Sequence, residues 1–503
     1  MLTSINHDFE SKDNSTKDKR MEDHIISPRE SILHEGEKPL TKLSVLKELL
    51  IAMVSTYLFN ILERLGLISN VYFMSRSGDS DLVAALGLAN TWIMLIGVGI
   101  ITNFSAGMST LVAQAYGANL PKLCSAYFHK GLVINLSLYC CYLLSLAFFK
   151  PMLRALGYDQ KLLETTNSYL IYMLPSVFGT GLFGTLKFYA QGHKIFKAPV
   201  YIQIGFTLIE CILSYFIIIK LDFGFPGLSL SRGFSELGRA LALFVYMKKS
   251  KVFEDTLSWF DSSSMNGFWP QLKFQANSGM VLYVDMLSFL TGQMILAGYD
   301  VDEYAASYSA MAVLTFFFSA THALIQPVMS YLGNAVGEGS AIKTGVYWDV
   351  SNKVSLVVSI TLSLIVVIFS PSLSRIYLDN STTTSLTQKI LMLYGTLLVF
   401  DVGQMYFSSV ARVFGKEQAA FVGMVLFDLV VGLSLASIMG LYFNFGALGV
   451  WVGMMTGIVL NAITQYNIVS SVNIRMYLKE TQQRLKREDA GKQQERLIEM
   501  QDF

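Results

Sequence analysis

The chain has 503 residues, of which 52% are hydrophobic and only 15% are charged, and its mean hydropathy is +0.45. Soluble domains carry roughly 25% charged residues, so this composition excludes an ordinary soluble protein and predicts a membrane protein. The net charge of +1 gives no reason to expect a nucleic-acid partner.

The N-terminal segment, residues 1–44, is polar and charged. It contains no apolar core near Met1, so we expect no cleavable signal peptide and interpret the segment as a cytosolic tail. The first apolar helix then serves as the membrane-targeting signal.

Twelve segments after this tail are long and apolar enough to cross a bilayer, since a spanning helix needs about 20 apolar residues. The fourth and sixth are the weakest, because Lys187 interrupts the fourth and Arg232, Glu236 and Arg239 interrupt the sixth. The pattern predicts an all-α polytopic membrane protein. The expected spans lie near residues 47–73, 83–113, 123–149, 163–189, 198–220, 226–247, 270–298, 304–332, 346–370, 388–411, 418–443 and 447–472.

Basic residues near the ends of the spans predict the orientation, because lysine and arginine are retained on the cytosolic side of a membrane. Lys248, Lys249 and Lys251 follow span six, and a basic segment follows span twelve, so both termini are expected in the cytosol. Lys150 and Arg154 oppose this assignment, since it places them outside. The resulting domains are an N-terminal lobe at 45–247, a cytosolic linker at 248–268, a C-terminal lobe at 269–473 and a solvated cytosolic tail at 474–503.

Two pairs of short motifs indicate an internal repeat. The sequence Gln114-Ala-Tyr-Gly117 returns as Asn334-Ala-Val-Gly337, and Phe223-Gly-Phe-Pro-Gly227 returns as Phe445-Gly-Ala-Leu-Gly449 at nearly the same offset along the chain. An even number of spans per repeat gives both halves the same direction, so we predict two parallel six-helix lobes with a cavity between them. Close helix packing alone would explain the glycines but not the spacing.

The stretch that closes span two, from Ser105 to Ala118, resembles the Thr-Leu-x-x-Gln-Ala-Tyr-Gly-Ala signature of multidrug and toxic compound extrusion (MATE) transporters, especially the eukaryotic branch. Three more matches follow in order, and the resemblance covers residues from about 45 to 473. It implies a twelve-helix, two-lobed exporter of organic cations and other toxic compounds that exchanges substrate for protons or sodium. The further matches are Gly333-Asn-Ala-Val-Gly-Glu-Gly339, Ser408-Ser-Val-Ala-Arg412 and Gly446-Ala-Leu-Gly-Val-Trp-Val-Gly453.

Acidic side chains inside the spans mark the places where function is expected, because a charge at the centre of a membrane helix costs about 2.5 to 3.5 kcal/mol. Such residues usually face a cavity or a partner, and a carboxylate there can bind a proton and later yield to a cation. Asp428 stands where relatives carry an aromatic residue and is given no role. The five deepest acids are Glu63, Glu210, Asp285, Asp401 and Asp428.

Asp285 and Asp401 are the predicted proton-coupling and substrate-binding residues. In eukaryotic members of the resembled family, a Glu in the seventh helix and an acid in the tenth are associated with proton coupling, and these two aspartates occupy the matching positions. The match is incomplete, since the second acid of the seventh-helix motif is Leu290 here. The alternative is that both acids merely pair with Arg412 or with polar side chains, although Arg412 lies about three turns beyond Asp401.

The N-terminal lobe offers secondary candidates. Bacterial relatives use an Asp in the first helix and an Asn in the fifth, and the matching positions here hold Asn70 and Glu210. A swapped ion site and a hydrogen-bonded packing pair are both open interpretations. Glu63 precedes Asp285 by the same offset that separates the two copies of the second motif, so it is a third candidate as the pseudo-symmetric partner of Asp285, unless Arg64 or another helix neutralises it.

The predicted function is secondary active antiport, in which organic cations, drugs or toxic metabolites leave the cytosol in exchange for protons, or for sodium, at the plasma membrane or an acidic organelle membrane. The alternative is a lipid or oligosaccharide flippase of the same broader superfamily, which would need basic residues along the cavity. No enzymatic activity or metal site is expected, because the six histidines form no catalytic or metal-binding array. We expect a monomer that needs no cofactor beyond the ion gradient and no partner beyond small organic substrates and the bilayer.

Overall fold

The computed structural model describes residues 41–75, 80–297, 300–376 and 381–499, and from Lys42 onward they belong to one compact unit. Most of these residues are helical, and no strand occurs within the four ranges. The all-α prediction is therefore confirmed. The predicted N-terminal tail falls almost wholly outside the described residues.

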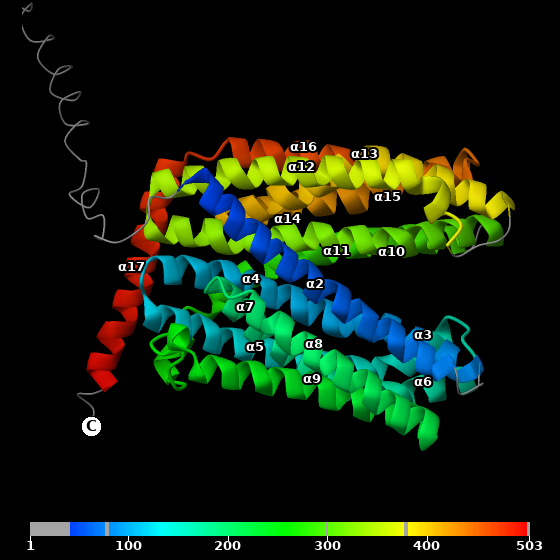
Figure 1. The fold of residues 1–503 in the computed structure, drawn as a ribbon, viewed down its shortest axis with the longest axis horizontal. Coiled ribbons are helices and arrows are strands. Elements are labelled where there is room, and N and C mark those ends of the chain that lie inside the picture. Colours follow the sequence, from blue (N-terminus) through cyan, green and yellow to red (C-terminus); the bar gives the residue numbers. More distant parts are fainter. Residues whose placement is uncertain (1–40, 76–79, 298–299, 377–380, 500–503) are drawn as a thin grey trace, which may run out of the picture. The chain divides into compact units, whose positions relative to one another are not determined.

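The first half of this unit, which we call the N-lobe, contains helices α2 to α9 (Figure 1). A π-helical turn at Ile93–Gly97 joins α3 to α4, another at Tyr215–Lys220 extends α8, and α6 and α7 are bent by 48° relative to each other. The helices are α2 (Lys42–Ser75), α3 (Ser80–Trp92), α4 (Val98–Gly117), α5 (Pro121–Ala155), α6 (Gln160–Tyr172), α7 (Leu174–Gly192), α8 (Lys197–Ser214) and α9 (Gly224–Lys249).

The second half, which we call the C-lobe, contains helices α10 to α16 and is followed by α17. One of its spans is irregular, because π-helical turns at Val425–Gly432 and Ile438–Tyr442 flank the short helix α15. The helices are α10 (Phe268–Ala297), α11 (Val301–Glu338), α12 (Ala341–Leu373), α13 (Ser381–Val413), α14 (Glu417–Met424), α15 (Leu433–Ser437), α16 (Gly446–Ser470) and α17 (Ile474–Glu499).

The helices that the structure describes include 10 that are long and apolar enough to cross a membrane, and the bent pair α6 and α7 makes an eleventh. Helix α9 takes the place of the predicted sixth span, where Arg232, Glu236 and Arg239 lower the apolar character. The bent fourth span and the less apolar sixth span are the two that charged residues interrupt in the sequence. The prediction of twelve membrane helices is thus roughly consistent with the structure.

Local sequence signals explain several helix ends. The carboxylate of Asp300 accepts hydrogen bonds from the backbone N–H groups of Asp302 and Glu303 at 2.9 and 3.0 Å, which caps the start of α11. The hydroxyl of Ser340 caps α12 in the same way. Between these helices Gly339 adopts the left-handed conformation with φ of 73°, which glycine tolerates best, so α11 ends there.

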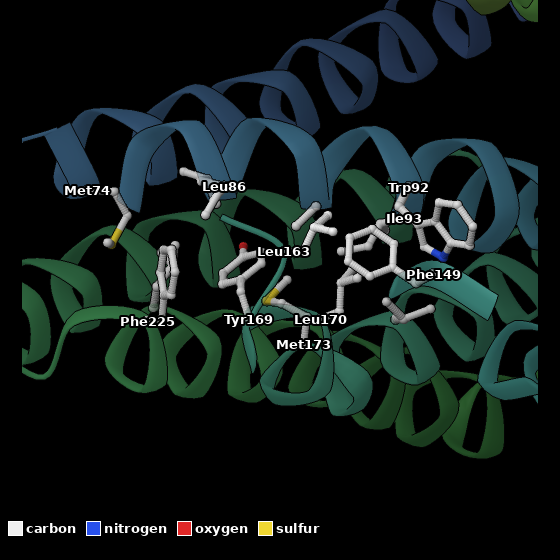
Figure 2. Close-up of a cluster of buried hydrophobic side chains, with 14 of the residues drawn as sticks. Met74, Leu86, Trp92, Ile93, Phe149, Leu163, Tyr169, Leu170, Met173 and Phe225 are labelled. Carbon is white, nitrogen blue, oxygen red and sulfur yellow. The ribbon is translucent and has the colours of Figure 1, made fainter. Parts of the chain in front are cut away.

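Each lobe is built around one central helix. In the N-lobe, α7 packs against α4 and α9, and in the C-lobe, α13 packs against α11, α12 and α16. Figure 2 shows part of the N-lobe interior, where Trp92 and Phe149 meet edge to face with ring centroids 5.1 Å apart. The lobes contact each other mainly through α4, which packs against α10 and α11, and through α2, which packs against α8 of its own lobe and against α11 and α12.

The C-terminal segment differs from the solvated tail expected from its composition. Within α17, the side chains of Leu478, Thr481 and Leu485 are buried, and their spacing places them on one helical face. The helix contacts the C-lobe, where the Tyr477 hydroxyl donates to the Val413 carbonyl at 2.9 Å. It also reaches the N-lobe through a hydrogen bond of 2.5 Å from the Tyr127 hydroxyl to the Glu488 carboxylate, so α17 joins the two lobes at one end of the bundle.

Candidate ion and substrate site

The two predicted coupling acids are brought together in the C-lobe. Asp285 lies in the middle of α10 and Asp401 in the middle of α13, and their exposed fractions are only 8% and 2%. The side-chain amide of Gln404, one turn after Asp401, donates to Asp401 Oδ1 at 3.2 Å and lies 3.4 Å from Asp285 Oδ1. One amide group therefore connects both carboxylates.

A tyrosine on the same helix holds the other oxygen of Asp401. The Tyr394 hydroxyl, two turns before Asp401 on α13, donates to Asp401 Oδ2 at 2.6 Å. The Tyr394 ring is surrounded by Phe318 and Trp451, with centroids 5.8 and 6.0 Å away, and by Phe289 at 6.5 Å. The tyrosine that holds Asp401 is therefore fully buried among aromatic rings.

The network continues to a third acid, Asp428, which had no predicted role. The side-chain amide of Asn461 on α16 donates to the Gln404 carbonyl oxygen at 2.9 Å and to Asp428 Oδ2 at 3.2 Å. Asp428 lies on the π-helical turn Val425–Gly432 and is 2% exposed. Its position inside a span was the available signal, but the sequence could not place it beside the other two acids.

No basic side chain is ion-paired with Asp285, Asp401 or Asp428 in the four described ranges. Arg412, the alternative partner considered above, instead donates to the backbone carbonyls of Ser408 and Ser278 at 3.3 and 3.2 Å. A buried carboxylate is costly unless a proton or another cation compensates it. The C-lobe network is therefore chemically suited to binding cations.

The N-lobe candidates Asn70 and Glu210 also meet. The Asn70 amide on α2 donates to Glu210 Oε1 on α8 at 3.0 Å, and both side chains are buried. Arg232 of α9 lies close enough for its charge to interact with that of Glu210. This carboxylate has a cation nearby, which distinguishes it from the acids of the C-lobe.

The basic residues that interrupt the predicted fourth and sixth spans also lie in the N-lobe. Arg239 forms an ion pair with Glu236, one turn earlier on α9, and donates to Gln203 on α8. The Lys187 ammonium group on α7 lies over the rings of Phe59 and Phe188, 4.3 and 4.5 Å from their centroids. Buried bases whose charges act on the buried acids therefore characterise the interior of the N-lobe, and none in the described part of the chain acts on the three acids of the C-lobe network.

Glu63 belongs to this mixed environment. Its charge acts on Lys187 of α7 and on the adjacent Arg64, whose guanidinium donates to the Ser319 hydroxyl of α11 at 2.6 Å. The amide of Asn60, one turn earlier, donates to the Ser319 carbonyl at 3.1 Å. Glu63 thus lies beside contacts between the lobes, whereas Asp285, its candidate repeat counterpart, lies inside the C-lobe network.

The two lobes therefore differ in charge although they repeat in fold. The C-lobe gathers three buried acids that have only neutral hydrogen-bond donors, and the N-lobe mixes acids with basic residues. A mobile positive charge is stabilised by the first arrangement and less so by the second. The C-lobe network is the candidate site of ion and cation chemistry.

Known proteins are similar to the chain over most of its length. The MatE family model matches residues 56–216 and 279–438, once in each lobe, as an internal repeat requires. Protein DETOXIFICATION 36 of Arabidopsis thaliana is 23% identical over 397 residues, which are 78% of this chain and 78% of that protein. Protein DETOXIFICATION 35 of the same plant is 24% identical over 443 residues, with 85% and 88% covered.

Solved structures share the fold. The crystal structure of the eukaryotic MATE transporter AtDTX14 superposes with a TM-score of 0.82 at 16% identity, covering 88% of this chain and 99% of that one. The MATE transporter ClbM in complex with Rb⁺ superposes with a TM-score of 0.72 at 16% identity, covering 87% and 97%. Together with the family model, which matches more than half of the sequence, these similarities establish that the chain is a multi-pass membrane protein that belongs to the multidrug and toxic compound extrusion (MATE) family of transporters.

Proposed function

We propose that this transporter exports organic cations in exchange for protons, and that Asp285 and Asp401 form the site at which the two compete. The observation that carries the proposal is the connected set of buried carboxyl groups with no ion-paired base in the described residues. Each such group needs a proton or a cation to offset the cost of burial.

The exchange follows from competition for the same charge. An organic cation from the cytosol binds while the site is ionised, and protons from the other side neutralise the carboxylates and release it. The emptied site then returns, and deprotonation in the cytosol restores the charge. Sodium is the second candidate for the coupling ion, because the related ClbM was solved with Rb⁺, another alkali cation.

The neighbouring aromatic rings support an organic cation as substrate. Tyr394 donates to Asp401, and Phe289, Phe318 and Trp451 pack around Tyr394. Ring faces attract cations as well as flat apolar groups. In this proposal the N-lobe acids Glu63 and Glu210 have a secondary part, in which they balance Lys187 and Arg232 while the lobe moves. Asn70 supports Glu210 through its hydrogen bond.

The orientation in the membrane, the source of the gradient and the binding partners also belong to the proposed function. We place α17 and both termini in the cytosol, because the basic segments predict it. The plasma membrane or the membrane of an acidic organelle supplies the proton gradient, no cofactor takes part, the chain works as a monomer, and its partners are small organic molecules and lipid.

The test is transport in proteoliposomes that contain the purified full-length protein. A fluorescent organic cation is offered under an imposed pH gradient, then under a sodium gradient, then with neither. We expect accumulation of the dye only under the pH gradient, accompanied by counterflow of protons. Accumulation driven by sodium alone would replace the proton in the proposal, and absence of dye movement under either gradient, with a range of organic cations, would refute it.

A further inference from the structure

We infer that Asp428 is a positioning residue. It fixes the orientation of the amide chain, by which we mean the hydrogen-bonded side-chain amides of Gln465, Asn461 and Gln404. In this orientation Gln404 presents its NH₂ group to Asp285 and Asp401. This inference rests on the proposed function, since it assigns Asp428 a part in the same site. It concerns an acid that the sequence pattern did not mark as functional.

The hydrogen bonds around Asn461 all run in one sense. Its carbonyl oxygen accepts from the Gln465 amide at 3.1 Å, and its NH₂ group donates to Asp428 Oδ2 at 3.2 Å and to the Gln404 carbonyl oxygen at 2.9 Å. The same NH₂ group also lies 2.7 Å from Met424 Sδ, a third acceptor. Because the carbonyl oxygen of Gln404 is already used, the NH₂ group of Gln404 faces the two coupling carboxylates.

The amide chain ends at two acceptors of different kinds, the backbone carbonyl of Ala420 and the carboxylate of Asp428. At one end, the Gln465 amide donates to the backbone carbonyl of Ala420 at 2.9 Å, and a backbone carbonyl accepts at any pH. At the other end, Asp428 is an obligatory acceptor only while it is ionised, because a protonated carboxyl group can donate. Protonation or substitution of Asp428 therefore removes one of the two anchors of the direction.

Reversal of the chain has a defined effect at Asp285 and Asp401. If Asn461 turned its oxygen toward Gln404, the Gln404 amide would turn as well and direct its own oxygen at two carboxylates. Hydrogen bonds to the charged form favour ionisation, and an acceptor facing a carboxylate favours protonation. The charge of Asp428 thus affects the ionisation of Asp285 and Asp401 through the neutral side chains of Asn461 and Gln404.

One carboxylate oxygen of Asp428, Oδ1, has no hydrogen-bond partner among the described residues, although the side chain is almost fully buried. An unpartnered buried carboxylate oxygen costs free energy, so it is available for a proton or a cation. Oδ2 fixes the direction of the amide chain, and Oδ1 is available to bind a proton or a cation.

The charged and titratable groups around Asp428 are few. The acids Asp285 and Asp401 act on it most directly, and Tyr394 lies beyond Asp401. Helix α15, which packs against the π-helical turn, carries no ionisable side chain. The other ionisable side chains on the helices packed against this turn are Glu417 of α14, Lys273 and Tyr283 of α10, and Tyr466 of α16.

The alternative is that Asp428 acts only as a nearby negative charge, and this alternative predicts the opposite sign. Removing a negative charge eases ionisation of Asp285 and Asp401, so proton-driven export would reach its half-maximum at lower pH. Losing the direction of the amide chain removes donors from the same carboxylates, so the half-maximum would move to higher pH. The sign of the shift separates a charge from a positioning residue.

The experiment measures the pH of half-maximal proton-driven dye transport in proteoliposomes for the wild type and three variants. Asp428→Asn removes the charge and keeps the volume, Asp428→Glu keeps the charge, and Asn461→Leu cuts the chain while Asp428 stays charged. We expect an upward shift of about half to one pH unit for Asp428→Asn and for Asn461→Leu, since one unit corresponds to about 1.4 kcal/mol of interaction. Asp428→Glu should lie closer to the wild type than Asp428→Asn.

Each other result overturns the inference. A downward shift for Asp428→Asn leaves Asp428 as a charge only, no shift leaves it without influence, and an unshifted Asn461→Leu removes the amide chain from the mechanism. Asp285→Asn and Asp401→Asn in the same assay keep the two levels apart. If those variants export with unaltered pH dependence, the proposed function fails; if they lose coupling while Asp428→Asn matches the wild type, only the present inference fails.

Discussion

Gly337 of α11 packs against the backbone carbonyl of Gln114 on α4, so closely that a β-carbon at Gly337 would overlap the carbonyl oxygen. The same contact occurs in reverse, since a β-carbon at Gly117 of α4 would overlap the carbonyl oxygen of Asn334 on α11. These four residues are the first and last positions of the two copies of the repeated motif. The repeat is therefore also a contact, in which the two copies close one end of the interface between the lobes.

The first prediction is that Gly337→Ala opens this end. Alternating access requires the lobes to separate where they are now closed, and a methyl group between α4 and the α11 backbone opposes closure. We expect a cysteine placed at buried Thr110 to react with a maleimide at least about tenfold faster in the Gly337→Ala background, which corresponds to roughly 1.4 kcal/mol against the closed state.

The control for this prediction is Gly205→Ala on α8, where a β-carbon would meet nothing within 4 Å. The four native cysteines are replaced by alanine in every protein, since two of them, Cys140 and Cys141, are exposed. Equal labelling rates in Gly337→Ala, Gly205→Ala and the parent would show that the glycine contact does not control closure.

The second prediction concerns the coupling acids. Asp285→Asn and Asp401→Asn remove one charge each with little change in volume, so proton-driven export should fall by at least about 100-fold, or roughly 2.7 kcal/mol in the coupled step. The Asp→Glu variants at both positions should retain partial activity with a displaced pH profile. Dye efflux driven by a pH gradient measures the loss.

Asp349→Asn is the matched control, because Asp349 is an aspartate on α12 whose partners are Lys42 and Lys353 and whose side chain is 38% exposed. Its export should stay within about twofold of the wild type, as is usual for surface substitutions. Normal pH dependence in both Asp285→Asn and Asp401→Asn, at normal expression, would move the coupling site to the N-lobe.

The third prediction separates the two interpretations of Glu210. Because a basic residue, Arg232, lies near this buried carboxylate and Asn70 donates to it, Glu210→Gln should destabilise the N-lobe by about 1–3 kcal/mol and leave the pH dependence of export unchanged. Thermal unfolding in detergent gives the first quantity, and the proteoliposome assay gives the second. A changed pH or sodium dependence with wild-type stability would instead make Glu210 and Asn70 a second ion site.

The fourth prediction concerns orientation. Ser381 begins α13 at the end of the bundle opposite to α17, and Lys479 is an exposed residue of α17. In intact cells that display the protein at the surface, a membrane-impermeant maleimide should label Ser381→Cys and not Lys479→Cys in the cysteine-free protein. The reverse pattern would invert the proposed direction of transport.

The sequence by itself determined the class of protein, the order of its helices and the identity of its family. Apolar segments of about 20 residues leave few alternatives to membrane helices, because lipid offers no hydrogen bonds to an unpaired backbone. The motif that ends at Gly117, and again at Gly337, identified the repeat. Both positions admit only glycine, because a β-carbon there would overlap a backbone carbonyl of the other helix. Asp285 and Asp401 were recognisable as acids in the membrane without any knowledge of their neighbours.

Tertiary structure alone decided which of the membrane acids act together. Asp428 joins Asp285 and Asp401 because α10, α13, α16 and the π-helical turn converge on Gln404 and Asn461, and no sequence spacing encodes that convergence. Glu63 looks equivalent to Asp285 along the chain but lies among basic residues. The charge state and function of a buried acid depend on the groups within a few ångströms of it, and for helices far apart in sequence only the packing of the lobes sets those distances.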